Sequence, residues 1–419
     1  MPSHPDTTAA VQSPPSPQRT RRLLALLAVL LLVAAAAGAF RLSAHLNERA
    51  LASASLTDLQ KMQTNQQNDE RVLFYLAQRQ EQSGQLKEAM ESYNKALQAD
   101  QDDEAAWFGF ARTTNAVVGS VHAREVVQTW LVRNPRSAGA YEMQARLDQR
   151  EGNHLSAYDT AVKAAALAPK NGDIWLLMGA EAMELERPAD AETAFRHAIE
   201  CKPKDWHNYV GLGNAQVLLG HHPESLAGFR AAVRLAPELG VPHLLLGTEL
   251  LNTAAADADI ETARAELLQS AQKTNTMPKN AQIQMATLLG ESYKRQHRWK
   301  EALGWYQQAE QGNPLDPTVQ YSLIAVYQGL GDKVASGRAE ARHREIEAYD
   351  QELKVTNSHI LAAPDDREAR LKLARLYRSH GAKAEAARTY QEWLSRSPND
   401  TVAQQELQDL LATTPTATP

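Results

Sequence analysis

The sequence has little cysteine and no excess of positive charge. One cysteine, Cys201, among 419 residues excludes an intramolecular disulfide and a Cys-x-x-Cys redox pair. The 44 Lys and Arg residues are outnumbered by 50 Asp and Glu residues, which gives a formal net charge of −6. A general nucleic-acid binder needs a basic stripe that displaces phosphate counterions. The charge balance therefore argues against a nucleic-acid partner. Aromatic residues are also sparse, at 6%.

Motifs that bind phosphates or metal ions are lacking as well. The chain has no Gly-x-x-x-x-Gly-Lys-Ser/Thr loop and no His-Glu-x-x-His, and its Gly-Leu-Gly run at 211–213 lacks the third glycine of a dinucleotide site. No carboxylate pattern completes a metal site at His221 and His222. No sequence pattern around Cys201 argues for a nucleophilic thiol. We therefore expect no catalytic residue, no metal, no cofactor and no small-molecule substrate.

One long apolar run is present near the N-terminus. Residues 23–40 read LLALLAVLLLVAAAAGAF, without a single charged side chain. At 1.5 Å per residue a helix of this length spans about 27 Å, just enough for a hydrocarbon core of about 30 Å. Residues 1–22 before it are rich in Pro, Ser and Thr, which predicts a disordered tail. The run itself predicts a transmembrane helix.

Two interpretations of residues 23–40 remain open. Ala37-Gly38-Ala39 fits a signal-peptidase site, so the run is consistent with a signal peptide whose cleavage would release a soluble exported protein. The run exceeds the usual h-region of about 7–15 residues, which favours a retained signal anchor. In both cases the arginines that precede the run keep the N-terminus cytoplasmic. We expect a single-pass membrane protein whose remaining chain lies on the exported, periplasmic side.

The strongest signal is an internal repeat with a period of 34, which follows a polar stretch at 41–69 that predicts a helical stalk. Pro135, Pro169, Pro203 and Pro237 recur at this constant interval. At a background of about 5% proline, this coincidence has a probability on the order of 10⁻⁴. Aromatic and glycine positions share the period: Trp107, Tyr141, Trp175 and Tyr209, then Gly179, Gly213 and Gly247. Independent residue types in one register indicate a repeat architecture.

With these residues the chain resembles the tetratricopeptide repeat (TPR) family, in which two antiparallel helices, A and B, fill each 34-residue repeat. Residues 172–205 fit the family pattern best, with Trp175, Met178, Gly179, Ala191, Phe195, Ala198 and Pro203. Proline ends helix B because it lacks an amide hydrogen and disfavours helical geometry in the preceding residue. The resemblance implies an all-α fold, a right-handed superhelical solenoid of helix hairpins whose stacking builds one continuous core.

Departures from the repeat pattern predict the boundaries of the segments in the rest of the chain. Residues 70–331 fit about eight repeats, with extra residues near 252–259 and 274–280. Within them, Val127 and Trp130 replace the usual aromatic and alanine, so that layer must pack differently. Residues 332–362 predict one long charged helix, within a connector (332–366) before a last repeat at 367–400. Residues 401–419 predict a capping helix and a disordered tail.

In TPR proteins ligands lie on the concave surface of helices A, at repeat positions 2, 5, 9 and 12. These positions are mostly apolar in the fourth to sixth repeats, although exposed helix positions are normally polar. Flanking repeats are polar there, as at Arg112, Asn115, Glu142, Arg146 and Gln149. The apolar stretch predicts a groove for an amphipathic helix or hydrophobic peptide, unless superhelical closure or a tail covers it. The predicted groove residues are Leu176, Ala180, Met183, Val210, Asn214, Val217, Val241, Leu244, Thr248 and Leu251.

These observations together predict a membrane-anchored, non-catalytic scaffold. Its partner would be a protein or peptide, and its place in the cell an envelope or secretion complex, by the resemblance. Two alternatives remain. One is a soluble exported adaptor released by cleavage at Ala39. The other is an enzyme with a site in the irregular segments 252–280 or 332–362.

Overall fold

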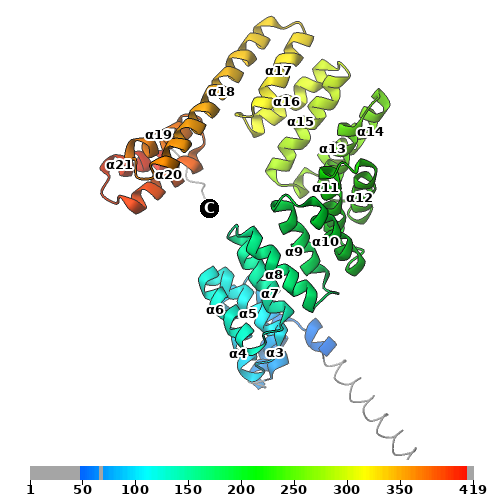
Figure 1. The fold of residues 1–419 in the computed structure, drawn as a ribbon, viewed down its shortest axis with the longest axis vertical. Coiled ribbons are helices and arrows are strands. Elements are labelled where there is room, and N and C mark those ends of the chain that lie inside the picture. Colours follow the sequence, from blue (N-terminus) through cyan, green and yellow to red (C-terminus); the bar gives the residue numbers. More distant parts are fainter. Residues whose placement is uncertain (1–47, 66–68, 413–419) are drawn as a thin grey trace, which may run out of the picture. The chain divides into compact units, whose positions relative to one another are not determined.

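The computed structural model describes residues 48–65 and 69–412. All regular secondary structure in these residues is helical, which confirms the predicted all-α class (Figure 1). The tail at 1–22, the predicted transmembrane helix at 23–40, part of the stalk at 41–69 and the tail after residue 412 lie outside the described residues. Of the helices that the structure does describe, none is long and apolar enough to span a bilayer.

The chain divides into two compact units, and the boundary falls between Glu181 and Ala182. The first unit contains α2 (Leu56–Asn65), α3 (Glu70–Gln82), α4 (Leu86–Ala99), α5 (Glu104–Val117), α6 (Ser120–Arg133), α7 (Ala138–Arg150) and α8 (His154–Leu167). The boundary lies within α9 (Gly172–Glu184). The second unit contains α10 (Pro188–Cys201), α11 (Trp206–Leu218), α12 (His222–Leu235), α13 (Gly240–Thr253), α14 (Asp257–Ala271), the 3₁₀ helix η1 (Thr274–Thr276), α15 (Lys279–Arg295), α16 (Trp299–Gly312), α17 (Pro317–Gly329), α18 (Lys333–Ala362), α19 (Arg367–Ser379), α20 (Lys383–Arg396) and α21 (Thr401–Ala412).

The helices pair as hairpins, whose first and second members are called helix A and helix B below. α3 packs on α4, α5 on α6 and α7 on α8, and the helices from α11 to α20 pair in the same way. The A helices from α3 to α13 begin at positions 70, 104, 138, 172, 206 and 240, which reproduces the predicted interval. Four B helices end two residues before a proline, at Pro135, Pro169, Pro203 and Pro237. Proline therefore closes helix B, as the sequence predicts.

Side-chain caps mark where several A helices begin. Asp69 accepts hydrogen bonds from the backbone N–H groups of Arg71, at 3.0 Å, and Val72, at 3.3 Å. The same role is played before α5, α11, α17 and α19 by Asp103, Asp205, Asp316 and Asp366. These carboxylates satisfy amide groups that a helix N-terminus otherwise leaves unpaired.

The core of several hairpins is an aromatic ring of helix B that lies against a glycine of helix A. The rings of Phe229 and Tyr306 are buried against Gly213 and Gly290 of their own hairpins. A Cβ added at Gly213 would lie 2.6 Å from Phe229 Cε1, and one added at Gly290 would lie 2.9 Å from Tyr306 Cγ. Each ring therefore occupies space that a side chain on helix A would need.

In the layer at Val127 and Trp130, a larger aromatic ring of helix B also packs against a glycine of helix A. Trp130 of α6 stacks on Trp107 of α5, with ring centroids 6.2 Å apart. The Trp130 ring also lies against Gly139 of α7, where an added Cβ would be 2.8 Å from Cη2. The indole fits at this alanine position because residue 139 has no side chain.

The C-terminal part of the second unit departs furthest from the regular repeat. α18 is a single helix of 30 residues, in the stretch where the sequence predicts one helix at 332–362. It packs against α17 and against α19. At the end of the described chain, an ion pair of 2.6 Å joins Arg367 Nε to Asp400 Oδ2, and this bond holds the pKa of the Asp400 carboxyl well below its usual range. Asp400 also caps α21 through the backbone N–H groups of Val402 and Ala403.

Replacement of one core glycine tests the contact between ring and backbone. We expect Gly213→Ala to lower the free energy of unfolding by about 1–3 kcal/mol, because the added methyl overlaps the Phe229 ring. Gly304→Ala is the matched control, since nothing lies within 4 Å of a Cβ at that helical position. The control should gain about 0.5–1 kcal/mol from helix propensity. Urea unfolding followed by circular dichroism measures both, and equal effects would contradict the packing argument.

Candidate functional site

The ten predicted groove residues do not share one environment. Leu176 and Ala180 lie on α9 in the first unit and are half-buried. The other eight belong to the second unit, where six are half-buried: Met183, Val210, Asn214, Val217, Val241 and Thr248. Leu244 and Leu251 are only 2% and 1% exposed. For these two residues the prediction of a solvent-facing groove is wrong.

Leu244 and Leu251 belong to the hydrophobic core of the second unit. They share a cluster of buried residues with Met285 and Leu289 of α15, and α13 packs on both α14 and α15. α15 has 17 residues, and near its end the Arg295 side chain donates a hydrogen bond of 2.8 Å to the Leu251 carbonyl. α15 therefore packs on the face of α13 that carries Leu244 and Leu251.

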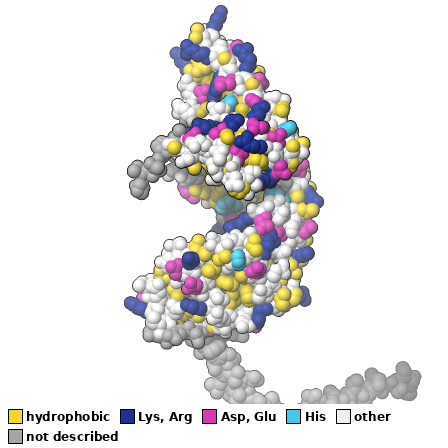
Figure 2. Space-filling model, turned by 90° about the vertical axis from the view of Figure 1, so that its left-hand side faces the viewer, with side chains coloured by type: hydrophobic (Ala, Val, Ile, Leu, Met, Phe, Trp, Pro, Cys, Tyr) yellow, Lys and Arg dark blue, Asp and Glu magenta, His cyan; other side chains and the backbone are white. Residues whose placement is uncertain are grey.

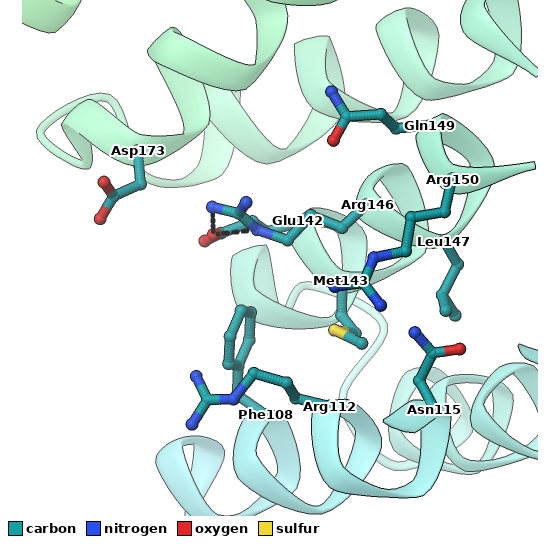
Figure 3. A pocket seen from close by; sticks show the side chains of 10 residues that line it. All are labelled: Phe108, Arg112, Asn115, Glu142, Met143, Arg146, Leu147, Gln149, Arg150 and Asp173. Carbon is teal, nitrogen blue, oxygen red and sulfur yellow. Dashed lines mark hydrogen bonds and ion pairs between the residues drawn. The ribbon is translucent and has the colours of Figure 1, made fainter. Parts of the chain in front are cut away.

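A cavity of about 460 Å³ lies in the first unit, at the polar positions that flank the predicted groove (Figure 3). Its lining consists of Phe108, Arg112, Asn115, Glu142, Met143, Arg146, Leu147, Gln149, Arg150 and Asp173, from α5, α7 and the start of α9. α5 and α7 are helices A of successive hairpins and pack directly on each other. Residues one repeat apart, such as Arg112 and Arg146, therefore line the same cavity.

Arg112 on α5 is held by a carboxylate of the preceding hairpin. Its Nε and Nη2 donate to the two carboxylate oxygens of Glu81, both at 2.6 Å. This bidentate bond raises the pKa of Arg112 above its ordinary value. The Tyr93 hydroxyl donates to the same carboxylate at 3.1 Å. The Arg112 guanidinium also lies 5.7 Å from the centroid of the Phe108 ring, so its position at the cavity edge is fixed from two sides.

Arg146 on α7 is oriented by a carboxylate of its own helix. Glu142 is buried and accepts from Arg146 Nε at 3.0 Å and Arg146 Nη2 at 2.8 Å. Its second oxygen accepts from Asn171 Nδ2 at 3.2 Å. A buried carboxylate needs such partners because burial disfavours its charge. Glu142 therefore holds Arg146 across the cavity (Figure 3).

The remaining polar side chains of the cavity differ in whether they form hydrogen bonds or ion pairs within the protein. Gln149 Nε2 donates at 2.5 Å to Glu181, a fully buried carboxylate that also bonds His154 Nδ1 at 2.9 Å. Arg150 is exposed and forms no ion pair with any residue that the structure describes. The cavity thus has two arginines held in place and a third that remains available to an anionic group.

The cavity therefore combines guanidinium groups with the half-buried ring of Phe108 and with Met143 and Leu147, which are almost fully buried. This arrangement suits recognition of a carboxylate next to an apolar side chain, because a guanidinium binds a carboxylate through paired N–H bonds. Several of these positions are recognisable as polar in the sequence, but the predicted groove lies among the apolar repeats instead. The sequence feature that indicates the cavity is the recurrence of arginine at one repeat position, at Arg112 and Arg146.

The histidines at 221, 222 and 343 and Cys201 lie outside the cavity lining. His222 Nδ1 bonds the buried carboxylate of Glu249 at 2.8 Å, and His221 Nδ1 lies 4.0 Å from Glu192. His343 lies 3.5 Å from Glu347 on α18, and Cys201 is half-buried at the end of α10. Among the residues that the structure describes, no group of three or more His, Cys, Asp or Glu side chains could hold a metal ion.

The charges of the surface are interspersed on the face that Figure 2 draws. Basic and acidic side chains lie next to one another there, with hydrophobic side chains between them. A nucleic-acid binder gathers its basic side chains into a patch or stripe. The face in Figure 2 does not have that character.

Models described as tetratricopeptide repeat match residues 70–113, 176–239, 286–318 and 346–401. No curated protein sequence matches the chain.

Several solved structures are similar to parts of the chain. YrrB, described as a TPR protein with an unusual peptide-binding site, is 20% identical, with a TM-score of 0.38 over 44% of this chain and 94% of its own. A tetratricopeptide repeat protein from Parabacteroides merdae is 15% identical, with a TM-score of 0.42 over 61% and 98%. Pseudomonas aeruginosa pilF is 15% identical, with a TM-score of 0.43 over 50% and 93%.

The role of Glu142 in the cavity can be tested through stability. Glu142→Gln leaves Arg146 beside a neutral acceptor, and we expect the free energy of unfolding of the first unit to fall by about 1.5–3 kcal/mol. Glu91→Gln is the control, since Glu91 is exposed and such surface changes stay within about 0.5 kcal/mol. Urea unfolding measured by tryptophan fluorescence reports both. A stability of Glu142→Gln equal to that of the control would show that the Arg146 contact contributes nothing.

Proposed function

Because this chain is a tetratricopeptide-repeat protein, we propose that it is a membrane-anchored scaffold that binds a peptide segment of a partner protein. The partner would bind on the A-helix face of the first unit, and the chain would carry out no chemical step of its own. Residues 23–40 would hold it in a membrane, with the repeats on the periplasmic side. Its task would be the assembly of an envelope or secretion complex.

The cavity between α5, α7 and α9 is the observation that carries the proposed binding site. It opens on helices A of successive hairpins, and its lining side chains are already oriented before a ligand arrives. Preorganised side chains lose less conformational entropy on binding. A volume of about 460 Å³ lies in the range typical of ligand pockets, about 300–1,000 Å³. It is large enough for one or two side chains of a peptide.

The chemistry of the lining selects the peptide. Arg150 is available for a carboxylate, and the half-buried ring of Phe108 offers apolar surface in the same cavity. We propose that the bound segment carries an acidic side chain or a C-terminal carboxylate next to an apolar residue. The half-buried apolar side chains Val210, Val217 and Val241 on α11 and α13 are a separate surface of the second unit. They would suit an apolar peptide segment.

The anchor rests on the sequence of residues 23–40. Their length matches a bilayer core, and the preceding arginines orient the N-terminus to the cytoplasm. A single helix of this kind holds the repeats close to the membrane surface. The scaffold would then recruit its partner to that surface.

The binding site can be tested by site-specific photo-crosslinking. A benzoyl-phenylalanine at position 149 lies in the cavity, and we expect it to give one discrete adduct with a partner protein in intact cells. The control position is Val132 on α6, which is 81% exposed and is not part of the cavity lining. Arg150→Glu should reduce the adduct at 149 by at least about tenfold, because it places like charges together. Identical adducts from both positions, unaffected by Arg150→Glu, would refute the site.

The anchor has its own experiment. If residues 23–40 span a bilayer, alkaline carbonate will leave the full chain in the membrane pellet, because a transmembrane helix is held by the hydrophobic effect and not by charge. Release of the full-length chain into the supernatant would refute the anchor. A mature N-terminus at Phe40 would instead establish cleavage after Ala39 and a soluble exported adaptor.

A further inference from the structure

α18 carries a long face that no described part of the chain covers. Its buried residues Ser336, Ala339, Ile346, Tyr349 and Thr356 alternate between spacings of 3 and 7 and so form one face. α17 and α19 both pack on α18, which runs as one continuous helix in Figure 1. The exposed side of the helix, called the open side below, includes Val355, which also borders a cavity with Lys372 and Arg375 of α19.

The open side has a regular pattern. Val334, Ala341, Ala348 and Val355 recur at heptad spacing, or two helical turns, and all four are exposed. Val334 is 65% and Val355 is 57% exposed. A Cβ added at Gly337, on the same side, would meet no atom within 4 Å. Small side chains at heptad spacing allow a second helix to approach closely.

The charges of α18 are divided between its two halves. Residues 333–344 contain four basic side chains and one acidic side chain, a net charge of +3. Residues 345–362 contain four acidic and one basic, a net charge of −3. Arg338 and Arg344 form no ion pair with any residue that the structure describes. The helix is thus complementary to a copy of itself that runs in the opposite direction.

We propose that this face, defined by Val334, Ala341, Ala348 and Val355, pairs two copies of the chain through antiparallel α18 helices. A twofold axis between Arg344 and Glu345 places Val334 opposite Val355 of the other copy and Ala341 opposite Ala348. The same axis brings Arg344 next to Glu345 of the other copy, and Arg338 next to Glu352. A twofold interface of this kind is self-complementary, as closed dimers require. The contact would extend over about 32 Å of helix between the two valines.

The two carboxylates of this arrangement already contact a cation of their own chain. Glu345 Oε2 lies 2.7 Å from Arg342 Nη1, and Glu352 Oε1 lies 2.9 Å from Lys372 Nζ. Each of these exposed contacts uses one carboxylate oxygen, and a carboxylate can accept bonds on both. The arginine of the other copy therefore adds to each pair and does not have to replace it.

This pairing shares no residue with the peptide site, because it uses the second unit and the cavity lining belongs to the first. The dimer would present two peptide sites on one membrane-bound assembly. Two linked sites bind a divalent partner more tightly than either alone. The inference stands without the proposed peptide, since its tests measure only self-association.

Charge reversal tests the antiparallel order. In the full chain, solubilised in a mild detergent, Arg338→Glu with Arg344→Glu makes the face acidic throughout, and Glu345→Arg with Glu352→Arg makes it basic throughout. Each double variant alone should self-associate at least about tenfold more weakly than the wild-type chain, because every cross-copy ion pair becomes a repulsion. An equimolar mixture should restore the dimer. Sedimentation velocity measures all three, and circular dichroism confirms equal helix content.

The matched control places the same charge change elsewhere. Arg230→Glu with Arg234→Glu alters two exposed arginines of α12 and should leave self-association unchanged. If the control weakens the dimer equally, the effect comes from net charge and the proposal fails. A wild-type chain that stays monomeric also overturns the proposed dimer. The open side of α18 is then exposed to solvent, or it is covered by the chain itself or by another protein.

Cross-linking fixes the direction of the pair without depending on the charge variants. The cysteine variants are made on a Cys201→Ala background. Residue 345 lies near the twofold axis, so Glu345→Cys should form a disulfide between residue 345 of one copy and residue 345 of the other. Val334→Cys alone should not, since the two copies of residue 334 lie about 32 Å apart. A mixture of Val334→Cys and Val355→Cys chains should cross-link. Efficient self-linking of Val334→Cys would establish a parallel pair and overturn the antiparallel one.

Discussion

The contact between an aromatic ring and a bare glycine sets how closely the helices of this protein approach. Phe229 lies on Gly213 and Tyr306 lies on Gly290, so each ring takes the place of a missing side chain. In these hairpins the ring limits how closely helix B approaches helix A. In the first unit, residues one repeat apart, such as Arg112 and Arg146, line one cavity.

The periodic part of the fold could be predicted from the sequence because local chemistry decides it. Proline ends helix B, aspartate begins helix A, and glycine admits the ring, and each acts within a short stretch of chain. The positions of Leu244 and Leu251 could not be predicted in this way. Their burial depends on side chains of α15 such as Met285 and Leu289, which follow them in the sequence. The 34-residue period assigns the same exposure to equivalent positions of every repeat. It does not show which of these positions a neighbouring helix covers.

The cavity could likewise be predicted from the sequence only in part. Its residues were recognisable as polar positions of helices A, and Glu142 and Arg146 are an i,i+4 pair that helical spacing predicts. The pairing of Arg112 with Glu81 joins two hairpins and does not follow from spacing. The sequence therefore predicts which residues face one side of the repeat array, and the structure is needed to say which of their charges are already neutralised.

The length of α18 has a consequence for how the protein unfolds. Elsewhere in the second unit, helices A of consecutive hairpins pack on each other, as α13 does on α15 and α15 on α17. α17 and α19 form no comparably packed pair in the described part of the chain, and the last hairpin is joined to the preceding repeats mainly through α18. In a linear array, cooperativity passes between neighbours through their shared interface. Where that interface narrows to one helix, the last hairpin and α21 become a separate unit of opening, able to exchange its amide hydrogens while the preceding repeats stay closed.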